Sequence, residues 1–457
     1  MTVRKLSVIL IALCLTVAAS VATAAGSHET TAAAPAASTA QTIDSAWIPT
    51  GQPATYFNVD GKTPDQIKGK ITYWSWDPNF FGMVKKMNMI YPNVTFDFVS
   101  VKDSTDYMLK LQTGLASGGV VPDVLAMEMA AVGRFYDMGI TEDIGSAPWN
   151  IDKKLLIPYL ASIGTDNQGK FIGVPNTVGA GAVYYRRDIA KKYLGTDDPQ
   201  KIGEMLSTWE GFIKTGEQLK QASGGKVSMV SGLDALVTPL IQQNGKPWRD
   251  GNKLLITQNY LDTFKFLARV KDARIDAGLD MWSPAYFASF AQDNVFCHVG
   301  SIWFESFIIK PNDPNGAGKW GVTNNPGKPY NWGGIWWGMY KGSKAKDAVA
   351  AYLRYEMSPI GAQNKYEMIH FYPGLQQAYT SDYITKPNEF FGGENVAPYY
   401  LDTMKKMTVP RPLENDDTFA NTFATYAQEL SHVGGDPAQL VAKVQSDMLA
   451  KFPDYQK

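Results

Sequence analysis

Cysteine is nearly absent from the sequence. The 457 residues include only Cys14 and Cys297, and Cys14 lies in an apolar segment that we expect to be cleaved off. One remaining cysteine cannot form an internal disulfide, which excludes a disulfide-stabilised scaffold. His298 follows Cys297, a pairing that thiol nucleophiles use, but residues 294–300 have the apolar texture of a buried strand. We therefore interpret Cys297 as an inert, buried side chain.

The chain also lacks a surplus of charge of either sign. It has 43 Lys and Arg against 44 Asp and Glu, a formal net charge of −1. Nucleic-acid binding requires excess basic side chains to displace counterions, so this balance argues against that class of partner. Hydrophobic residues make up 45% of the chain and charged residues 19%, which is typical of a globular protein. The length predicts two or three domains or lobes.

Sequence motifs of common enzyme classes are missing as well. The sequence has no Gly-x-Ser-x-Gly, no His-Glu-x-x-His, no phosphate-binding loop and no paired-cysteine motif. Its four histidines are scattered, and Gly179-Ala180-Gly181 is only a fragment of a dinucleotide-binding turn. We predict no catalytic residue, no metal site and no cofactor. A carboxylate pair for glycoside hydrolysis has no sequence signature, so a secreted glycoside-processing enzyme stays open as an alternative.

The N-terminal residues have the pattern of a secretion signal. Arg4 and Lys5 precede the apolar residues 6–17, which are too few to span a bilayer, and Ala22-Thr23-Ala24 is a small-x-small cleavage site. We predict a signal peptide over residues 1–24, cleaved near Ala24, and a periplasmic or secreted protein.

A lipid anchor at Cys14 does not fit the sequence. Leu13 is larger than the residue that usually precedes a lipidated cysteine, and the residues after Cys14 stay apolar. Residues 25–67 are interpreted as a flexible leader, rich in Ala, Thr, Ser and Pro, followed by an N-terminal extension.

Strands and helices alternate from residue 68 onward. Strands are predicted for residues 71–76, 94–99 and 122–127, and helices for residues 80–91 and from a capping Ser104 to Gly118. This order predicts a parallel α/β sheet, with Trp74 in its core. Further amphipathic helices are predicted to start at Thr208 and to cover residues 261–268 and 348–357.

The order of these segments resembles the periplasmic solute-binding proteins of ABC importers, specifically the carbohydrate-binding branch of the maltose-binding type. The resemblance covers about residues 68–450. The motifs that carry it are Ile71 to Asp77, Tyr107 to Gly118 with Pro122-Asp123-Val124, Gly173-Val174-Pro175 with Tyr184 to Asp188, Thr208-Trp209-Glu210, Phe296 to Trp303, and Trp332-Gly333-Gly334 with Ser343 to Ala348.

This resemblance implies an α/β fold of two lobes, joined by crossing strands that act as a hinge, with a ligand cleft between the lobes. Residues 70–178 and 335–408 are expected to form the N-terminal lobe, and residues 180–334 and 409–457 the C-terminal lobe. Gly179 and Gly181 lie in the expected first crossing, residues 177–182, where a hinge must absorb backbone rotation.

The resemblance places a sugar-stacking tryptophan at Trp303. A sugar ring has an apolar face, which an aromatic ring can cover, and a rim of hydroxyls, which carboxylates, amides and Arg can satisfy. The chain has 12 Trp and 23 Tyr, so side chains of this kind are plentiful. The alternative for Trp303 is a structural role in the core.

Further ligand-binding candidates follow from strand ends and from the family positions. They are Trp76 and Asp77 at the end of the first strand, Glu128 after the third, Asn176 at the hinge, and Glu305, Trp332, Gly334, Trp336 and Arg411. Structural alternatives are a helix N-cap for Asp77, a solvated charge for Glu128, core packing for Trp332 and Trp336, and ion pairs for Glu305 and Arg411.

The resemblance thus implies a monomeric receptor that captures a mono- or oligosaccharide and delivers it to the permease subunits of an ABC importer, without chemistry. One alternative keeps the fold but changes the ligand to a non-sugar solute, such as a polyamine. The other is the glycoside-processing enzyme, which would need two carboxylates facing each other across the cleft.

Overall fold

The computed structural model describes residues 43–76 and 81–457. The predicted signal peptide with Cys14 and the candidate Asp77 lie outside these residues. Among the helices described, none is long and apolar enough to cross a membrane.

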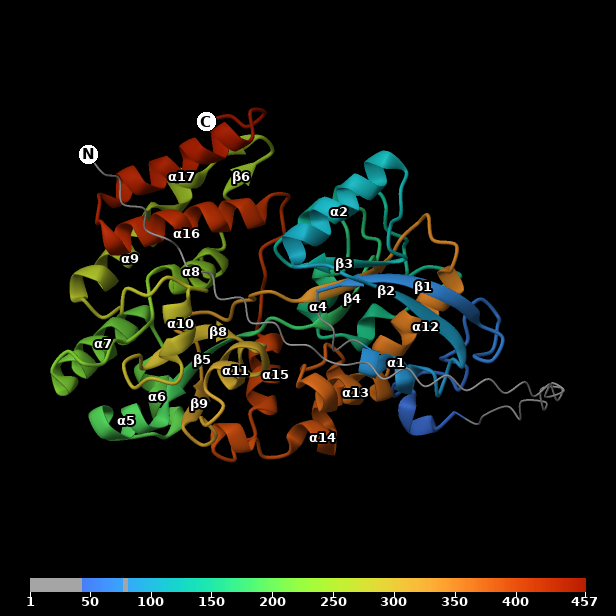
Figure 1. Ribbon diagram of the computed structural model, residues 1–457, viewed down its shortest axis with the longest axis horizontal. Coiled ribbons are helices and arrows are strands. Elements are labelled where there is room, and N and C mark those ends of the chain that lie inside the picture. Colours follow the sequence, from blue (N-terminus) through green and yellow to red (C-terminus); the bar gives the residue numbers. More distant parts are fainter. Residues whose placement is uncertain (1–42, 77–80) are drawn as a thin grey trace, which may run out of the picture. The chain divides into compact units, whose positions relative to one another are not determined.

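The first sheet has five strands and follows the predicted α/β pattern (Figure 1). Their order is β2 (Asn93–Ser100), β1 (Lys68–Ser75), β3 (Val124–Glu128), β10 (Ile335–Met339) and β4 (Val174–Thr177). β1 pairs in parallel with β2 and with β3, which confirms the parallel arrangement predicted for these three strands. β10 comes from much later in the chain and runs antiparallel to both of its neighbours, β3 and β4.

The second sheet has three antiparallel strands. Their order is β8 (Cys297–Ser301), β5 (Gly181–Arg186) and β9 (Trp320–Thr323), and β6 (Arg249–Asp250) and β7 (Lys253–Leu254) form a separate hairpin. Cys297 is fully buried in β8, and its thiol donates to the carbonyl of Met229 at 3.2 Å. Burial raises the pKa of this thiol, so the interpretation of Cys297 as an inert core residue agrees with its surroundings.

Helices cover both sheets (Figure 1). Those in the chain segments around the first sheet are α1 (Phe81–Met87), α2 (Ser104–Ser117), α3 (Val132–Met138), α4 (Pro158–Ile163), α12 (Lys346–Glu356), α13 (Pro359–Ile369), α14 (Asp382–Thr385) and α15 (Ala397–Lys405). The others are α5 (Arg187–Leu194), α6 (Pro199–Met205), α7 (Trp209–Ser223), α8 (Val237–Asn244), α9 (Ile256–Ala273), α10 (Pro284–Ser289), α11 (Lys310–Asn312), α16 (Asp416–His432) and α17 (Pro437–Lys451). Short 3₁₀ turns are η1 (Ser45–Trp47), η3 (Lys153–Leu155), η4 (Asp234–Leu236), η6 (Gln376–Thr380) and η7 (Glu389–Phe391), and η5 (Glu305–Ile309) is a π-helix.

Two helix boundaries differ from the sequence prediction. The cap of α2 is Asp103, whose carboxylate accepts from the Asp106 amide, and not Ser104; Gly118 ends the helix at φ 65°, as predicted. α1 stops at Met87, because the side-chain amide of Asn88 donates to the carbonyls of Tyr91 and Val94 and turns the chain toward β2.

Two large apolar clusters fill most of the described interior, beside a small one of Ala362, Leu375 and Ala378. One surrounds the first sheet and includes Trp74, which is 2% exposed and confirms its predicted core position. The other joins the second sheet to helices α7, α9, α16 and α17, where the rings of Phe264 and Phe423 stack at 4.3 Å. The C-terminal helices therefore pack with the elements of the second sheet, while the exact lobe boundaries stay a prediction.

The connection from β4 to β5 is broken and not one continuous strand. β4 ends at Thr177 and β5 begins at Gly181 in the other sheet. A Cβ atom on Gly179 would lie 2.3 Å from the Gly333 carbonyl oxygen, and one on Gly181 would lie 2.4 Å from the ring of Tyr330. Both glycines are thus required by close packing, a constraint that the hinge prediction did not include.

Candidate functional site

The larger cavity lies at the carboxyl end of β3 and has a volume of about 710 Å³, which is the size of a small-molecule site. Its walls come from α2, from the residues after β3, from α8, from Trp303, from the turn at residues 331–333 and from residues 410–421. Chain segments that belong to both sheets therefore converge on one cavity, as the family resemblance implied.

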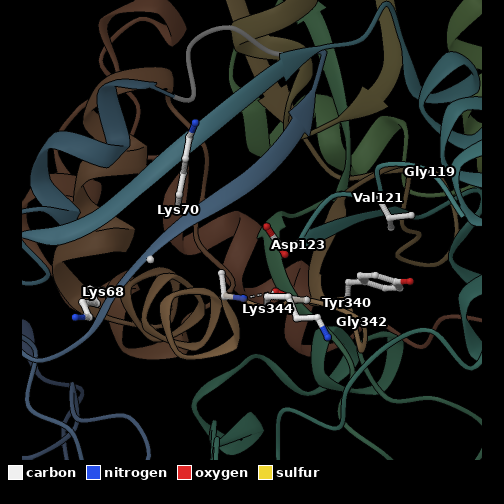
Figure 2. Close-up of a pocket in the computed structure, with 11 residues that line it drawn as sticks. Lys68, Lys70, Gly119, Val121, Asp123, Tyr340, Gly342 and Lys344 are labelled. Atoms are coloured by element: carbon white, nitrogen blue, oxygen red, sulfur yellow. Dashed lines mark hydrogen bonds between the residues drawn. The ribbon is translucent and has the colours of Figure 1, made fainter.

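A second cavity, of about 510 Å³, lies at the opposite, amino-terminal ends of β1 and β3. Figure 2 shows that the ammonium of Lys70 points away from Asp123. Lys70 lies 3.5 Å from Asp97, and Asp123 accepts a hydrogen bond from the Thr72 amide at 2.7 Å. Because open α/β sheets bind ligands at the carboxyl ends of their strands, we take the larger cavity as the candidate site.

Two tryptophans form a fixed aromatic corner in the larger cavity. The rings of Trp303 and Trp332 meet edge to face, with centroids 6.2 Å apart and planes at 84°. The indole N–H of Trp303 donates to the main-chain carbonyl of Trp332 at 2.8 Å. Both side chains line the cavity and are partly exposed, so part of each indole is available to a ligand.

Two glycines allow this close approach. Gly333 has φ 77° and Gly334 has φ 107°, values that favour glycine. A Cβ atom on Gly333 would lie 3.0 Å from Trp303 Nε1, and one on Gly334 would lie 2.9 Å from the Thr177 carbonyl oxygen. Gly333 lines the cavity, whereas the predicted Gly334 does not line it and serves the turn behind it.

Charged side chains line the cavity on the side of α3 and α16. Glu128 is partly exposed, and its carboxylate accepts from the Ala130 amide at 2.8 Å. Burial in its surroundings raises the pKa of Glu128 to about 7. Arg134 donates to both carboxylate oxygens of Asp417 at 2.7 Å, and the Asp417 amide donates to the Ala130 carbonyl at 3.1 Å.

Asp416 is the third carboxylate at this side of the cavity, after Glu128 and Asp417. It accepts from the indole of Trp248 at 2.6 Å and from the Leu413 amide at 2.8 Å, and burial raises its pKa to about 6. Sequence reasoning missed Arg134, Asp416 and Asp417. The sequence does carry one signal for the two aspartates, because they lie a few residues after position 409, where the chain is expected to pass into the C-terminal lobe for the last time.

Arg411, a predicted ligand-binding residue, lies in the wall of the cavity, and its guanidinium already has partners in the protein. Its guanidinium lies 3.8 Å from the ring centroid of Tyr136 and donates to the Thr165 carbonyl at 2.8 Å and to the side chain of Asn167 at 3.0 and 3.1 Å. This arrangement favours a role in fixing the wall of the cavity.

Trp336 requires a correction, because the sequence prediction placed it at the ligand. Its side chain is fully buried, and its indole donates to the Leu160 carbonyl at 3.1 Å. Four of the five residues of β10 are buried, and the Trp336 side chain lies against Gly164 and Gly173, so it packs in the core.

Three other candidates do not line this cavity. Asn176 is buried, and its main-chain carbonyl accepts from Lys365 at 3.0 Å. Glu305 is buried in the π-helix η5, where it accepts from Lys310 and from Asn388, each at 2.8 Å. Trp76 is partly exposed and packs edge to face on Tyr107 at 5.9 Å. For Glu305 the structure shows the ion pair that was its alternative role.

The chemistry of the site suits a ligand with an apolar face and a polar rim. The aromatic corner offers the face, and carboxylates, Arg134 and the amides of Gln112 and Gln242 offer the rim. Within residues 43–76 and 81–457, no group of three or more His, Cys, Asp or Glu side chains is placed to hold a metal ion.

Comparison with known proteins gives a family match and related sequences. Residues 82–392 match the family described as bacterial extracellular solute-binding protein. A lactose-binding protein of Rhizobium radiobacter is 26% identical over 84% of this chain and 92% of its own length. An arabinooligosaccharide-binding protein of Halalkalibacterium halodurans is 22% identical over 85% of this chain and 91% of its own.

Solved structures share the fold. An extracellular solute-binding protein of family 1 superposes with a TM-score of 0.74 at 18% identity, covering 83% of this chain and 98% of that one. The galacto-N-biose-/lacto-N-biose I-binding protein of an ABC transporter from Bifidobacterium longum superposes with a TM-score of 0.69, also at 18% identity, covering 86% and 100%. These likenesses confirm the two-lobed α/β fold class predicted from the sequence.

Proposed function

Because the chain belongs to the bacterial extracellular solute-binding protein family, we propose that it is the sugar-capturing receptor of an ABC importer. It binds a sugar in the larger cavity and presents the loaded form to the permease, without chemistry. The observation that carries this proposal is the fixed corner of Trp303 and Trp332 beside Glu128 and the Arg134–Asp417 ion pair. The two relatives that bind lactose and arabinooligosaccharides support a sugar as the ligand.

The ligand works by shifting a conformational equilibrium. A sugar favours the closed receptor only by the contacts that it makes in that form and not in the open form. Contacts between Arg134 and Asp417, and between the Asp417 amide and the Ala130 carbonyl, already join α3 and the turn before it to α16 beside the cavity. Residues of the cavity are thus drawn from elements that would have to separate on opening. Capture takes place outside the cytoplasm, in the periplasm or at the cell surface, with the signal peptide directing export.

A thermal-melting panel tests the proposal. Residues 25–457 are melted with D-galactose, lactose, L-arabinose, arabinotriose, D-glucose, maltose and maltotriose, with spermidine and glycine as non-sugar controls. A ligand at one hundred times its dissociation constant stabilises the folded state by about 2.7 kcal/mol. We expect one sugar series to raise the melting temperature and the sugar to be recovered intact by chromatography.

The other outcomes are equally informative. Stabilisation by a non-sugar alone would replace the sugar with another solute, and a sugar recovered in cleaved form would indicate the glycoside-processing enzyme. A Trp303→Ala variant that folds but no longer responds to the sugar would place the ligand at the aromatic corner. Trp209→Ala is the matched control, because Trp209 is also partly exposed and hydrogen-bonded, to Gln243 at 2.8 Å, but does not line the cavity.

A further inference from the structure

Trp282 is the most exposed tryptophan of this chain. All 12 tryptophans lie in the described residues, and Trp282 keeps 45% of its surface exposed while the other eleven are buried or partly buried. An indole has a large apolar face, so leaving it in water forgoes the free energy that burial would supply.

The backbone of Trp282 adopts an unfavourable conformation. Its φ is 67°, in the left-handed region that a bulky L-residue rarely adopts. Strained residues persist only where the surroundings hold them, and they cluster at ligand-binding positions. The strained backbone at Trp282 is therefore of the kind that occurs at ligand-binding positions.

Hydrogen bonds on both sides fix this conformation. The Met281 amide donates to the carboxylate of Asp234, which is 6% exposed, at 2.8 Å, and Gln428 donates to the same oxygen at 2.8 Å. The Leu279 amide donates to the Ser231 carbonyl at 2.9 Å. Directly after Trp282, Ser283 caps α10 by accepting from the Tyr286 amide at 3.1 Å. The indole is thus presented by a braced segment.

The indole of Trp282 continues the surface of Trp303. The two ring planes are nearly parallel, at 17°, and their centroids lie 6.3 Å apart. This separation is typical of offset rings, in which one ring extends beyond the edge of the other. Trp332, by contrast, stands nearly perpendicular to Trp303. Trp282 does not itself line the cavity, but through its ring contact with Trp303 it forms a stepped, nearly parallel aromatic platform that extends from the corner to the outside of the cavity.

We propose that Trp282 is an outer stacking residue of the binding site, and that the ligand is an oligosaccharide of at least two units. One sugar unit lies against Trp303, and the next unit covers the exposed face of Trp282. This inference rests on the proposed sugar-binding function and deepens it by assigning chain length. A single sugar ring would occupy the corner of Trp303 and Trp332 and leave the exposed face of Trp282 uncovered.

Calorimetric titration of Trp282→Ala with matched pairs of sugars tests the inference. The probes are lactose against D-galactose, arabinotriose against L-arabinose, and maltotriose against D-glucose, using whichever pair binds the wild type. We expect the variant to bind the oligosaccharide about 5- to 10-fold more weakly, as loss of one aromatic contact predicts. The dissociation constant of the monosaccharide should change by less than about 2-fold.

Two more variants guard against an effect on folding. Trp282→Phe keeps an aromatic face and should retain most of the oligosaccharide affinity, while Trp209→Ala removes a tryptophan elsewhere and should leave both affinities unchanged. Equal weakening for oligosaccharide and monosaccharide, or no weakening for either, would overturn the inference and leave the sugar-binding proposal intact. A wild type that binds none of the sugars would overturn both. A wild type that binds only the oligosaccharide, with the expected loss in Trp282→Ala, supports the inference.

Discussion

Replacing Glu128 by Gln should change how the stability of this protein depends on pH. Burial raises the pKa of Glu128 from 4.5 to about 7 in the folded protein. The folded state therefore holds the proton more tightly than the unfolded chain does. The stability associated with this group is complete below pH 4.5 and is lost as the pH rises through 7. Gln keeps a side-chain oxygen for the Ala130 amide and does not ionise.

The size of the effect follows from the pKa difference. A change from 4.5 to about 7 corresponds to about 3 kcal/mol, since each pKa unit is worth about 1.4 kcal/mol. We expect wild type and Glu128→Gln to have similar free energies of unfolding at pH 4. At pH 8 the variant should be more stable by up to about 3 kcal/mol, because only the wild type then holds a charge in these partly desolvated surroundings. Asp416, whose pKa is also raised, is present in both proteins and cancels from the comparison.

Urea unfolding followed by tryptophan fluorescence at pH 4 to 8 measures this difference. A gap between the two proteins that stays constant across that range would refute the reasoning, because it would assign the effect of the substitution to packing. Glu210→Gln is a control of opposite sign. The hydrogen bond from Arg269 lowers the pKa of Glu210, so its stabilising contribution is present at neutral pH and is lost on acidification.

Three further substitutions give sharp expectations. Trp303→Ala should weaken sugar binding by about 1–3 kcal/mol in calorimetry with the fold retained, whereas Trp209→Ala should not; an unfolded Trp303→Ala would assign Trp303 to the core. In urea unfolding, the free energy of unfolding of Trp282→Gly should exceed that of Trp282→Ala by about 1 kcal/mol, since glycine accepts φ 67°. Equal free energies of unfolding would mean that the backbone of this segment relaxes in the variants. Gly181→Ala should lower stability by about 1–3 kcal/mol, because its Cβ would lie 2.4 Å from the buried ring of Tyr330; an unchanged melting temperature would contradict this close packing.

Local patterns predicted the parts of the fold that depend on neighbouring residues. The strand around Trp74 was predicted from its aromatic and β-branched residues, and the end of α2 at Gly118 from glycine's freedom at positive φ. The family resemblance, and not periodicity, pointed to Trp303 and Trp332. The structure brings these two side chains together in the cavity.

The failures concern residues whose surroundings come from distant chain segments. Alternation in β10 does not say which side chains face a ligand when the strand is covered on both sides, so Trp336 was misplaced. The partner of Arg134 lies far along the chain at Asp417, and no local pattern pairs them. The position of Trp282 depends on a left-handed backbone conformation that tryptophan rarely adopts. Residue propensities therefore did not predict this conformation or the exposed indole that it presents.

The position of β10 in the first sheet has a consequence for biosynthesis. Ile335, at its start, bonds to Thr177 of β4 across 158 residues of sequence, and the strand separates β3 from β4. A chain emerging from the ribosome cannot complete this sheet until most of the sequence has been made, and closing so long a loop is slow. The edges of β3 and β4 stay unpaired during that time. The second sheet can close earlier, because β5, β8 and β9 all precede β10 in the sequence.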